Sequence, residues 1–394
     1  MPVGHNRPVT AVLLRKLLPA LITVAVLSAA CGQTHPEQAT NPAPTTRAEP
    51  TATTTTTTTK PPTTRAPTPA DSDRGEIRFR GVNLAGAEFG FNRLPGEFGV
   101  DYTYPGSEDV SFFVNLGMDT VRLPFLWERL QPRLGEEFDS SEQARLEAFV
   151  TTAREQGMTV ILDPHNYARY HGSPIGSAEV PTAAFTDLWS RLAHLFGGDP
   201  GVVFGLMNEP YDMAAETWLE QANSAVAAIR SVGAPNLILV PGTQYTGADS
   251  WLADWYGTPN GEVMDGVVDP LDNYAIEVHQ YLDEDSSGTS PVCVSTAIGT
   301  QRLEQFTSWL RRRGEVAFLG EFGGGDNSVC LDAIDGMLSY LEDNGDVWIG
   351  WTYWAAGPWW GEDPFEIQPG PEGQIDPQLE ILIRHLPAPR DLSP

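Results

Sequence analysis

Short apolar runs alternate with amphipathic segments at a spacing of about forty residues through most of the chain, and this feature limits the fold most. The helices expected between the runs, at 145–156, 183–196, 217–231, 301–313 and 331–344, carry apolar residues three and four positions apart. The predicted strands are 78–84, 120–123, 159–163, 202–207, 237–240, 275–278, 316–320 and 347–353. Eight strands with intervening helices predict an α/β fold, the (β/α)8 or TIM barrel. An open doubly wound sheet is the alternative, but no Gly-x-Gly-x-x-Gly turn follows the first strand.

Side chains that can carry chemistry follow every predicted strand. In a barrel these strand ends meet at one face, where active sites lie. Taken singly, each has an ordinary explanation: a solvated Glu, an ion-paired Arg or a His packed in the core. Their presence at successive strand ends instead indicates one catalytic face. The set comprises Asn83, Arg122, His165, Asn208, Glu209, Gln244, His279, Tyr281, Glu321 and Trp354.

Two of these residues are carboxylates, Glu209 after the fourth predicted strand and Glu321 after the seventh. A glycosidic bond held between them could be protonated from one side and attacked from the other. If the carboxyl groups lie ~5–5.5 Å apart, the second attacks directly and the sugar keeps its configuration. The positive charge of Arg122 nearby would keep Glu321 ionised. The apolar neighbours Met207 and Pro210 would keep Glu209 protonated.

Three tryptophans, Trp354, Trp359 and Trp360, follow the eighth predicted strand. The flat face of an indole stacks on the apolar face of a pyranose ring, and its N–H can reach a hydroxyl. Glycine and proline at 357–358 make 355–360 a loop, which favours a binding surface. Tryptophans on the predicted helices are expected to pack in the core.

The motifs together resemble glycoside hydrolase family five, the family-A cellulases, and are most similar to its fungal-type endoglucanase branch. The resemblance covers about 77–370. It rests on Gly81-Val-Asn-Leu-Ala-Gly86, Val121-Arg-Leu-Pro-Phe125, Asp163-Pro-His-Asn-Tyr167, Asn208-Glu-Pro210, Val278-His-Gln-Tyr281, Gly320-Glu-Phe322 and the 351–360 segment.

The resemblance implies a retaining endo-β-1,4-glucanase that acts on β-glucan without a metal or other cofactor. It makes Glu209 the general acid/base and Glu321 the nucleophile. Another β-glycanase, such as a mannanase or mixed-linkage glucanase, stays an alternative, and a glycan-binding surface lipoprotein is a third. From the resemblance and the three tryptophans, the expected substrate-binding set is Arg122, His165, Asn208, His279, Tyr281, Trp354, Trp359 and Trp360.

The three cysteines are too few for a disulfide-built scaffold, and no Cys-x2-Cys spacing indicates zinc. Cys293 follows the sixth predicted strand, and Cys330 comes shortly after the seventh. Neighbouring loops at the barrel mouth could bring them into bonding distance, and the resemblance supports a disulfide. Two separate buried thiols are the alternative.

The first 70 residues are expected to lie outside the catalytic domain, which we place at 71–394. Residues 1–30 are typical of a signal peptide, because their apolar run of 14 residues is short of the ~20 that span a bilayer. Cys31 follows a sequence similar to the lipobox of bacterial lipoproteins, so a lipid anchor and simple secretion both stay open. Both alternatives place the mature protein outside the cytoplasm. Residues 31–70, rich in Thr and Pro, predict a disordered linker.

Charge excludes some partners. The chain has 24 Lys and Arg against 52 Asp and Glu, a net charge of -28. Binding to nucleic acid phosphates or to an anionic membrane needs a positive field, so neither partner is expected. An uncharged polysaccharide substrate is compatible with this surface, and we expect a monomer.

Overall fold

The computed structural model describes residues 75–387, except 256, 362, 371 and 372. The predicted signal peptide (1–30), Cys31 and the predicted linker (31–70) lie outside the described residues. Within the described part, no helix has the length and apolar character needed to cross a membrane.

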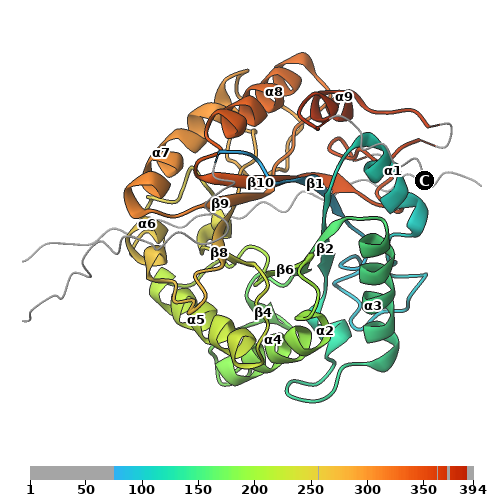
Figure 1. The fold of residues 1–394 in the computed structure, drawn as a ribbon, viewed down its shortest axis with the longest axis vertical. Helices are drawn as coiled ribbons and strands as arrows, with labels where there is room; N and C mark the ends of the chain where they lie inside the picture. Colours follow the sequence, from blue (N-terminus) through green and yellow to red (C-terminus); the bar gives the residue numbers. More distant parts are fainter. Residues whose placement is uncertain (1–74, 256, 362, 371–372, 388–394) are drawn as a thin grey trace, which may run out of the picture. The chain divides into compact units, whose positions relative to one another are not determined.

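Eight parallel strands close into a barrel (Figure 1), in the order β1-β10-β9-β8-β7-β6-β3-β2. The closing contact is the parallel pairing of β1 with β10, which excludes the open sheet and confirms the predicted barrel. The strands are β1 (Phe79–Leu84), β2 (Thr120–Phe125), β3 (Thr159–Pro164), β6 (Val202–Gly205), β7 (Ile238–Pro241), β8 (Tyr274–His279), β9 (Ala317–Glu321) and β10 (Trp348–Ala356).

Helices surround the barrel (Figure 1), and the five predicted from apolar spacing are all present. Helices α1 and α9 were not predicted, since α1 buries only Val110 and Phe113 and α9 has eight residues. The long helices are α1 (Ser107–Leu116), α3 (Ser140–Glu155), α4 (Thr182–Phe196), α5 (Ala215–Ser231), α7 (Ile298–Arg313), α8 (Ser328–Asp343) and α9 (Pro377–Arg384). Shorter elements are α2 (Trp127–Leu130), β4 (Arg169–Tyr170), β5 (Ser173–Pro174), η2 (Gln244–Thr246), α6 (Asn260–Val263) and η3 (Met264–Gly266).

The inside of the barrel changes from apolar to charged along the strands. An apolar cluster that includes Ile161 on β3 and Ala275 on β8 fills its lower part. Residues two apart on a strand share a face, so Asp163 follows Ile161 and Glu277 follows Ala275 on the inside. The apolar layer therefore closes the barrel below a layer of buried polar groups at the carboxyl ends of the strands.

A disulfide joins Cys293, in the loop after β8, to Cys330 in the first turn of α8. The two Cα atoms are 5.2 Å apart, and the bond spans 37 positions of sequence. This confirms the expected pairing over the alternative of two thiols. In the chain-entropy account, closing a loop of this length stabilises the fold by about 4 kcal/mol.

Candidate active site

Arg122 on β2 lies at the centre of the charged layer, and its side chain has no solvent exposure. Its Nη1 donates to Glu321 Oε1 at 2.8 Å, and its Nη2 donates to Asn208 Oδ1 at 2.9 Å. Two more carboxylates, Asp163 and Glu277, lie 3.1 and 3.0 Å from the guanidinium. The structure thus places Arg122 beside Glu321, as the sequence predicted, and makes it the common partner of three buried acids.

Glu321 ends β9 and is held from two sides. Besides the bond from Arg122, its Oε2 accepts a hydrogen bond from the hydroxyl of Tyr281 at 2.8 Å. Burial alone would raise the pKa of Glu321, but the charges of His279 and Arg122 outweigh it and lower the pKa below its usual value. Glu321 is therefore a buried carboxylate that stays ionised in mildly acidic solution.

Glu209 follows β6 and has a left-handed backbone, with a φ of 41°. Its Oε1 lies 2.7 Å from Nδ1 of His279. Burial raises the pKa of Glu209, and the opposing effect of His279 does not cancel that rise. The two carboxyls therefore have pKa values shifted in opposite directions, the pattern that separates an acid from a nucleophile.

Glu209, His279 and Glu321 offer side-chain atoms that all lie within 4.8 Å of one another, a spacing that could also suit a metal ion. Those atoms are already paired with protein groups, and Arg122 places a positive charge 2.8 Å from Glu321. A divalent cation would meet that charge directly. The arrangement therefore fits a proton-sharing pair of carboxyls better than a metal site.

His165 connects the charged layer to the predicted aromatic platform. Its Nδ1 is 2.8 Å from Asp163 Oδ2, and its Nε2 is 3.2 Å from the side-chain amide of Asn208. The imidazole stacks on Trp354 with ring centres 5.4 Å apart and planes 20° apart. Because Arg122 holds the oxygen of the Asn208 amide and His165 faces its nitrogen, the orientation of this side chain is set at both ends.

The predicted tryptophan loop is shorter than expected. Trp354 lies inside β10, which continues to Ala356, so the loop begins at 357 rather than 355. Trp360 packs edge-on against Trp354, with ring centres 5.8 Å apart, and its buried Nε1 has no hydrogen-bond partner in the described part of the chain. Trp359 is 42% exposed. Trp354 and Trp360 are therefore in direct contact, whereas Trp359 lies at the surface.

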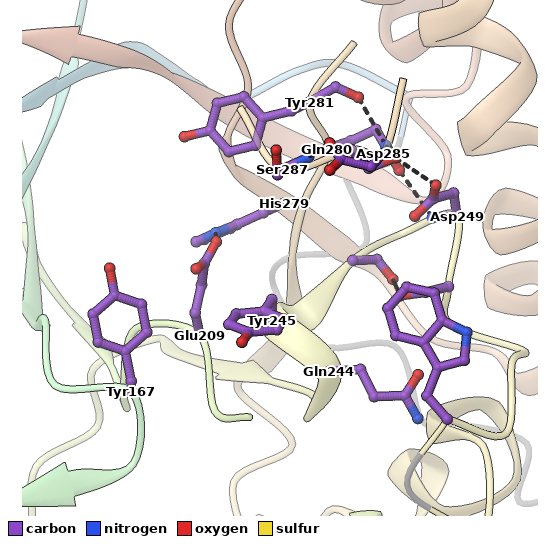
Figure 2. A pocket seen from close by; sticks show the side chains of 14 residues that line it. Tyr167, Glu209, Gln244, Tyr245, Asp249, His279, Gln280, Tyr281, Asp285 and Ser287 are labelled. Atoms are coloured by element: carbon purple, nitrogen blue, oxygen red, sulfur yellow. Dashed lines mark hydrogen bonds and ion pairs between the residues drawn. The ribbon is translucent and has the colours of Figure 1, made fainter. Parts of the chain in front are cut away.

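A cavity of about 430 Å³ opens beside Glu209 and His279. Figure 2 shows Gln244 and Tyr245 along it, and Asp249 and Asp285 at the end away from Glu209. Of its lining residues, the sequence prediction named Glu209, Gln244, His279 and Tyr281 only. Tyr245 and Trp255 line it as well and were missed, since nothing in an isolated aromatic residue in a loop shows which way it points. Tyr167, which also lines it, ends the motif 163–167 but was given no role there.

The wall of this cavity contains an unusual backbone segment. Gln244, Tyr245 and Thr246 are three consecutive non-glycine residues with left-handed φ values of 60°, 56° and 50°. Such residues cost of order 1–3 kcal/mol each and persist only where the surroundings hold them. Here the hydroxyl of Thr246 accepts from the backbone N–H of Gly242 and donates to the carbonyl of Glu277. Tyr245 also stacks on Tyr211 at 4.9 Å.

Comparison with known proteins places the chain in a family. Residues 82–357 match the family described as Cellulase (glycosyl hydrolase family 5). The chain belongs to this family. The endo-β-1,4-glucanase B of Emericella nidulans is 39% identical over 297 residues, which cover 75% of this chain and 88% of that protein.

Solved structures of similar proteins agree with the assignment to family 5. An endo-β-1,4-glucanase from Xanthomonas axonopodis pv. citri is 49% identical, with a TM-score of 0.77 and coverage of 78% of this chain and 98% of that one. The structure of XacCel5A in complex with cellopentaose is also 49% identical, with the same TM-score and coverage of 78% and 99%.

Two buried carboxylates beside this family 5 site were not singled out from the sequence. Asp163 and Glu277 stand two residues before His165 and His279, on β3 and β8. Two positions along a strand bring side chains to the same face, so each acid lies beneath its histidine. The Asp-x-His and Glu-x-His spacing was the signal that could have identified them.

Proposed function

We propose that this family 5 chain is a retaining endo-β-1,4-glucanase that hydrolyses internal bonds of a β-glucan. The observation that supports the mechanism is the close approach of the two carboxyls: one side-chain oxygen of Glu209 lies within 4.8 Å of one side-chain oxygen of Glu321. Inverting enzymes need a gap of ~6.5–9.5 Å to admit water between the two groups, whereas retaining enzymes need ~5–5.5 Å. Two findings support a β-glucan as the substrate: the relatives carry the name endo-β-1,4-glucanase, and a similar structure contains cellopentaose.

In the proposed first step, Glu321 attacks the anomeric carbon of the sugar bound over it. The bond from that carbon to the glycosidic oxygen breaks, and Glu209 gives its proton to the departing oxygen. The products are a glycosyl ester on Glu321 and a free alcohol end on the leaving chain. The opposed pKa shifts of the two groups supply the starting protonation states.

In the second step, the now ionised Glu209 takes a proton from a water molecule, whose oxygen attacks the same carbon and breaks the ester. Glu321 leaves as a carboxylate, which the hydrogen bonds from Arg122 and Tyr281 stabilise. Two inversions at one carbon leave the sugar in its original β configuration.

The sugar attacked by Glu321 is proposed to stack on Trp354, with His165 and His279 beside it. The amide of Asn208, fixed between Arg122 and His165, would donate to the 2-hydroxyl, a bond that strengthens in the transition state. Trp359 and Trp360 would extend the aromatic surface to further sugar units.

The test of substrate class is a side-by-side assay on carboxymethylcellulose, glucomannan and mixed-linkage glucan. The proposal predicts a fall in carboxymethylcellulose viscosity well ahead of the release of reducing ends, as internal cleavage requires. Activity restricted to mannan would show that the chain is instead a mannanase on the same scaffold, and activity restricted to mixed-linkage glucan would show a mixed-linkage glucanase.

We also propose that residues 1–30 direct export, that 31–70 form a linker and that 71–394 form the catalytic domain. The composition of the first 70 residues supports this arrangement. If Cys31 carries a lipid, labelled palmitate will enter the wild-type chain and not the Cys31→Ala variant. An unlabelled wild-type chain recovered in the medium would leave simple secretion.

A further inference from the structure

Glu277 is a buried carboxylate that the mechanism above does not use. It lies on β8 inside the barrel, 1% exposed, two residues before His279. Its Oε1 is 3.0 Å from Arg122 Nε and 3.7 Å from His279 Nε2. The barrel leaves room for it at Gly320 on β9, where an added Cβ would stand 2.3 Å from that oxygen and 3.0 Å from Nε2 of His279.

Glu277 lies closer to Arg122 than to His279, but the Arg122 side chain has several other partners. The guanidinium keeps Asn83, Asn208, Asp163 and Glu321 as partners if Glu277 is lost. His279 Nε2, by contrast, has no hydrogen-bond partner, and within the described residues Glu277 supplies the one carboxylate at ion-pair distance from it. The opposite nitrogen, Nδ1, faces Glu209 at 2.7 Å and Glu321 at 3.5 Å.

We propose that Glu277 is a positioning residue for the acid/base step: its buried charge holds His279 so that Nδ1–H stays directed at Glu209 Oε1. The proposal rests on the proposed function, because it concerns the role of Glu209 in that reaction. His279 then donates to one oxygen of the carboxyl, and the other oxygen is left to carry the proton to the glycosidic oxygen.

Electrostatics agree with this arrangement. Burial opposes a charge on His279, but the surrounding carboxylates of Glu321, Glu209 and Glu277 raise its pKa to about 10. Both ring nitrogens therefore carry protons in the acidic and neutral range, and the ring has no acceptor that could compete for the proton of Glu209. Of these three carboxylates, Glu277 is the one that takes no part in the two-step reaction.

The experiment compares two substrates with the Glu277→Gln variant of the full chain. Cellotetraose has a sugar leaving group that needs protonation, whereas 2,4-dinitrophenyl β-cellobioside has a leaving group that departs without it. We expect kcat/KM for cellotetraose to fall on the order of 10- to 100-fold, part of the ~10²–10⁴ that general acid catalysis supplies, and kcat/KM for the aryl substrate to fall far less.

A matched control is Glu142→Gln, which removes a 3%-exposed carboxylate outside the site, where it accepts hydrogen bonds from Tyr102 and Tyr104. Thermal unfolding would change in this variant, but the ratio of the two kcat/KM values would not. If Glu277→Gln fails to fold, Glu277→Asp keeps the charge on a shorter side chain and is expected to give a smaller loss with the same preference between substrates.

Equal losses of kcat/KM on both substrates would overturn the proposal and show that Glu277 acts on Glu321 through Arg122. A loss on neither substrate in both Glu277 variants would overturn it as well. Failure of the wild-type protein to hydrolyse either cellulosic substrate would instead refute the proposed function, so the two failures are distinguishable.

Discussion

At the scale of single residues, the site separates two chemically identical carboxyls by their surroundings. Glu321 is buried and Glu209 is partly buried, and burial alone would raise the pKa of each. The difference lies in their hydrogen-bond partners. Arg122 and Tyr281 donate to Glu321, whereas His279 is the one hydrogen-bonding side chain of Glu209 in the described structure. Arg122 thus adds to the effect of His279 at Glu321, and this separates the proposed nucleophile from the proposed acid.

A pH profile follows from these opposed shifts. Activity needs Glu321 ionised and Glu209 protonated, so kcat/KM should fall below the lowered pKa of Glu321 and again above the raised pKa of Glu209. Initial rates on cellotetraose between pH 3 and 9 should therefore give a bell with its maximum in the acidic range. A rate that rises steadily to pH 9 would be inconsistent with this assignment.

Glu88 gives a prediction about stability. This buried side chain accepts a hydrogen bond from the backbone N–H of Gly86 at 2.8 Å, and burial raises its pKa to about 7. Between pH 4.5 and 7 the unfolded chain loses this proton while the folded chain keeps it, so the folded state loses stability as pH rises through that interval. The full effect is of order 3 kcal/mol above pH 7.

The Glu88→Gln variant keeps an acceptor for Gly86 and removes the titration. Its unfolding free energy should match the wild type near pH 4 and exceed it at pH 8, as measured by urea unfolding at both values. Equal pH dependence in the two proteins would mean that Glu88 is not the buried proton-binding group.

At the scale of elements, strands were easier to predict than the site they build. Eight short apolar runs identified the strands because the barrel strands are buried, and the strand ends supplied the ten candidate site residues. The same reasoning could not identify Glu88 or Trp255. Their roles depend on contacts between loops and between distant strands, which no local pattern records.

The left-handed segment η2 directs Gln244 and Tyr245 to the cavity, which Trp255 also lines. The cavity borders Glu209 and does not include Trp354, so it suits the leaving side of the substrate. Trp255 is 60% exposed, as a sugar platform should be.

Trp255→Ala should lower kcat/KM for cellopentaose about tenfold, equal to about 1.4 kcal/mol. It should leave an aryl cellobioside almost unaffected, because that substrate has no sugar on the leaving side. Phe98→Ala, which removes a 43%-exposed aromatic ring outside this cavity, is the control. Equal effects on the two substrates would place Trp255 outside the path of the glucan.

At the scale of the molecule, the net negative charge of the domain is unrelated to the charges that build the site. Residues 71–394 hold 18 basic and 50 acidic residues, yet the site itself is built around a buried arginine and two histidines. The surface charge does not attract or repel an uncharged glucan, and it instead favours solubility. The barrel contributes a rigid frame that brings residues from β2, β6, β8 and β9 within hydrogen-bonding distance.

In the proposed mechanism, the barrel brings Glu209 and Glu321 close enough for direct attack with retention of configuration. Proton NMR of cellotetraose hydrolysis, recorded before the new reducing ends interconvert, tests it most directly. We expect the β anomer of the product to appear first and the α anomer only later, by mutarotation. An initial burst of the α anomer would show that water attacks directly and would contradict the role of Glu321 as nucleophile.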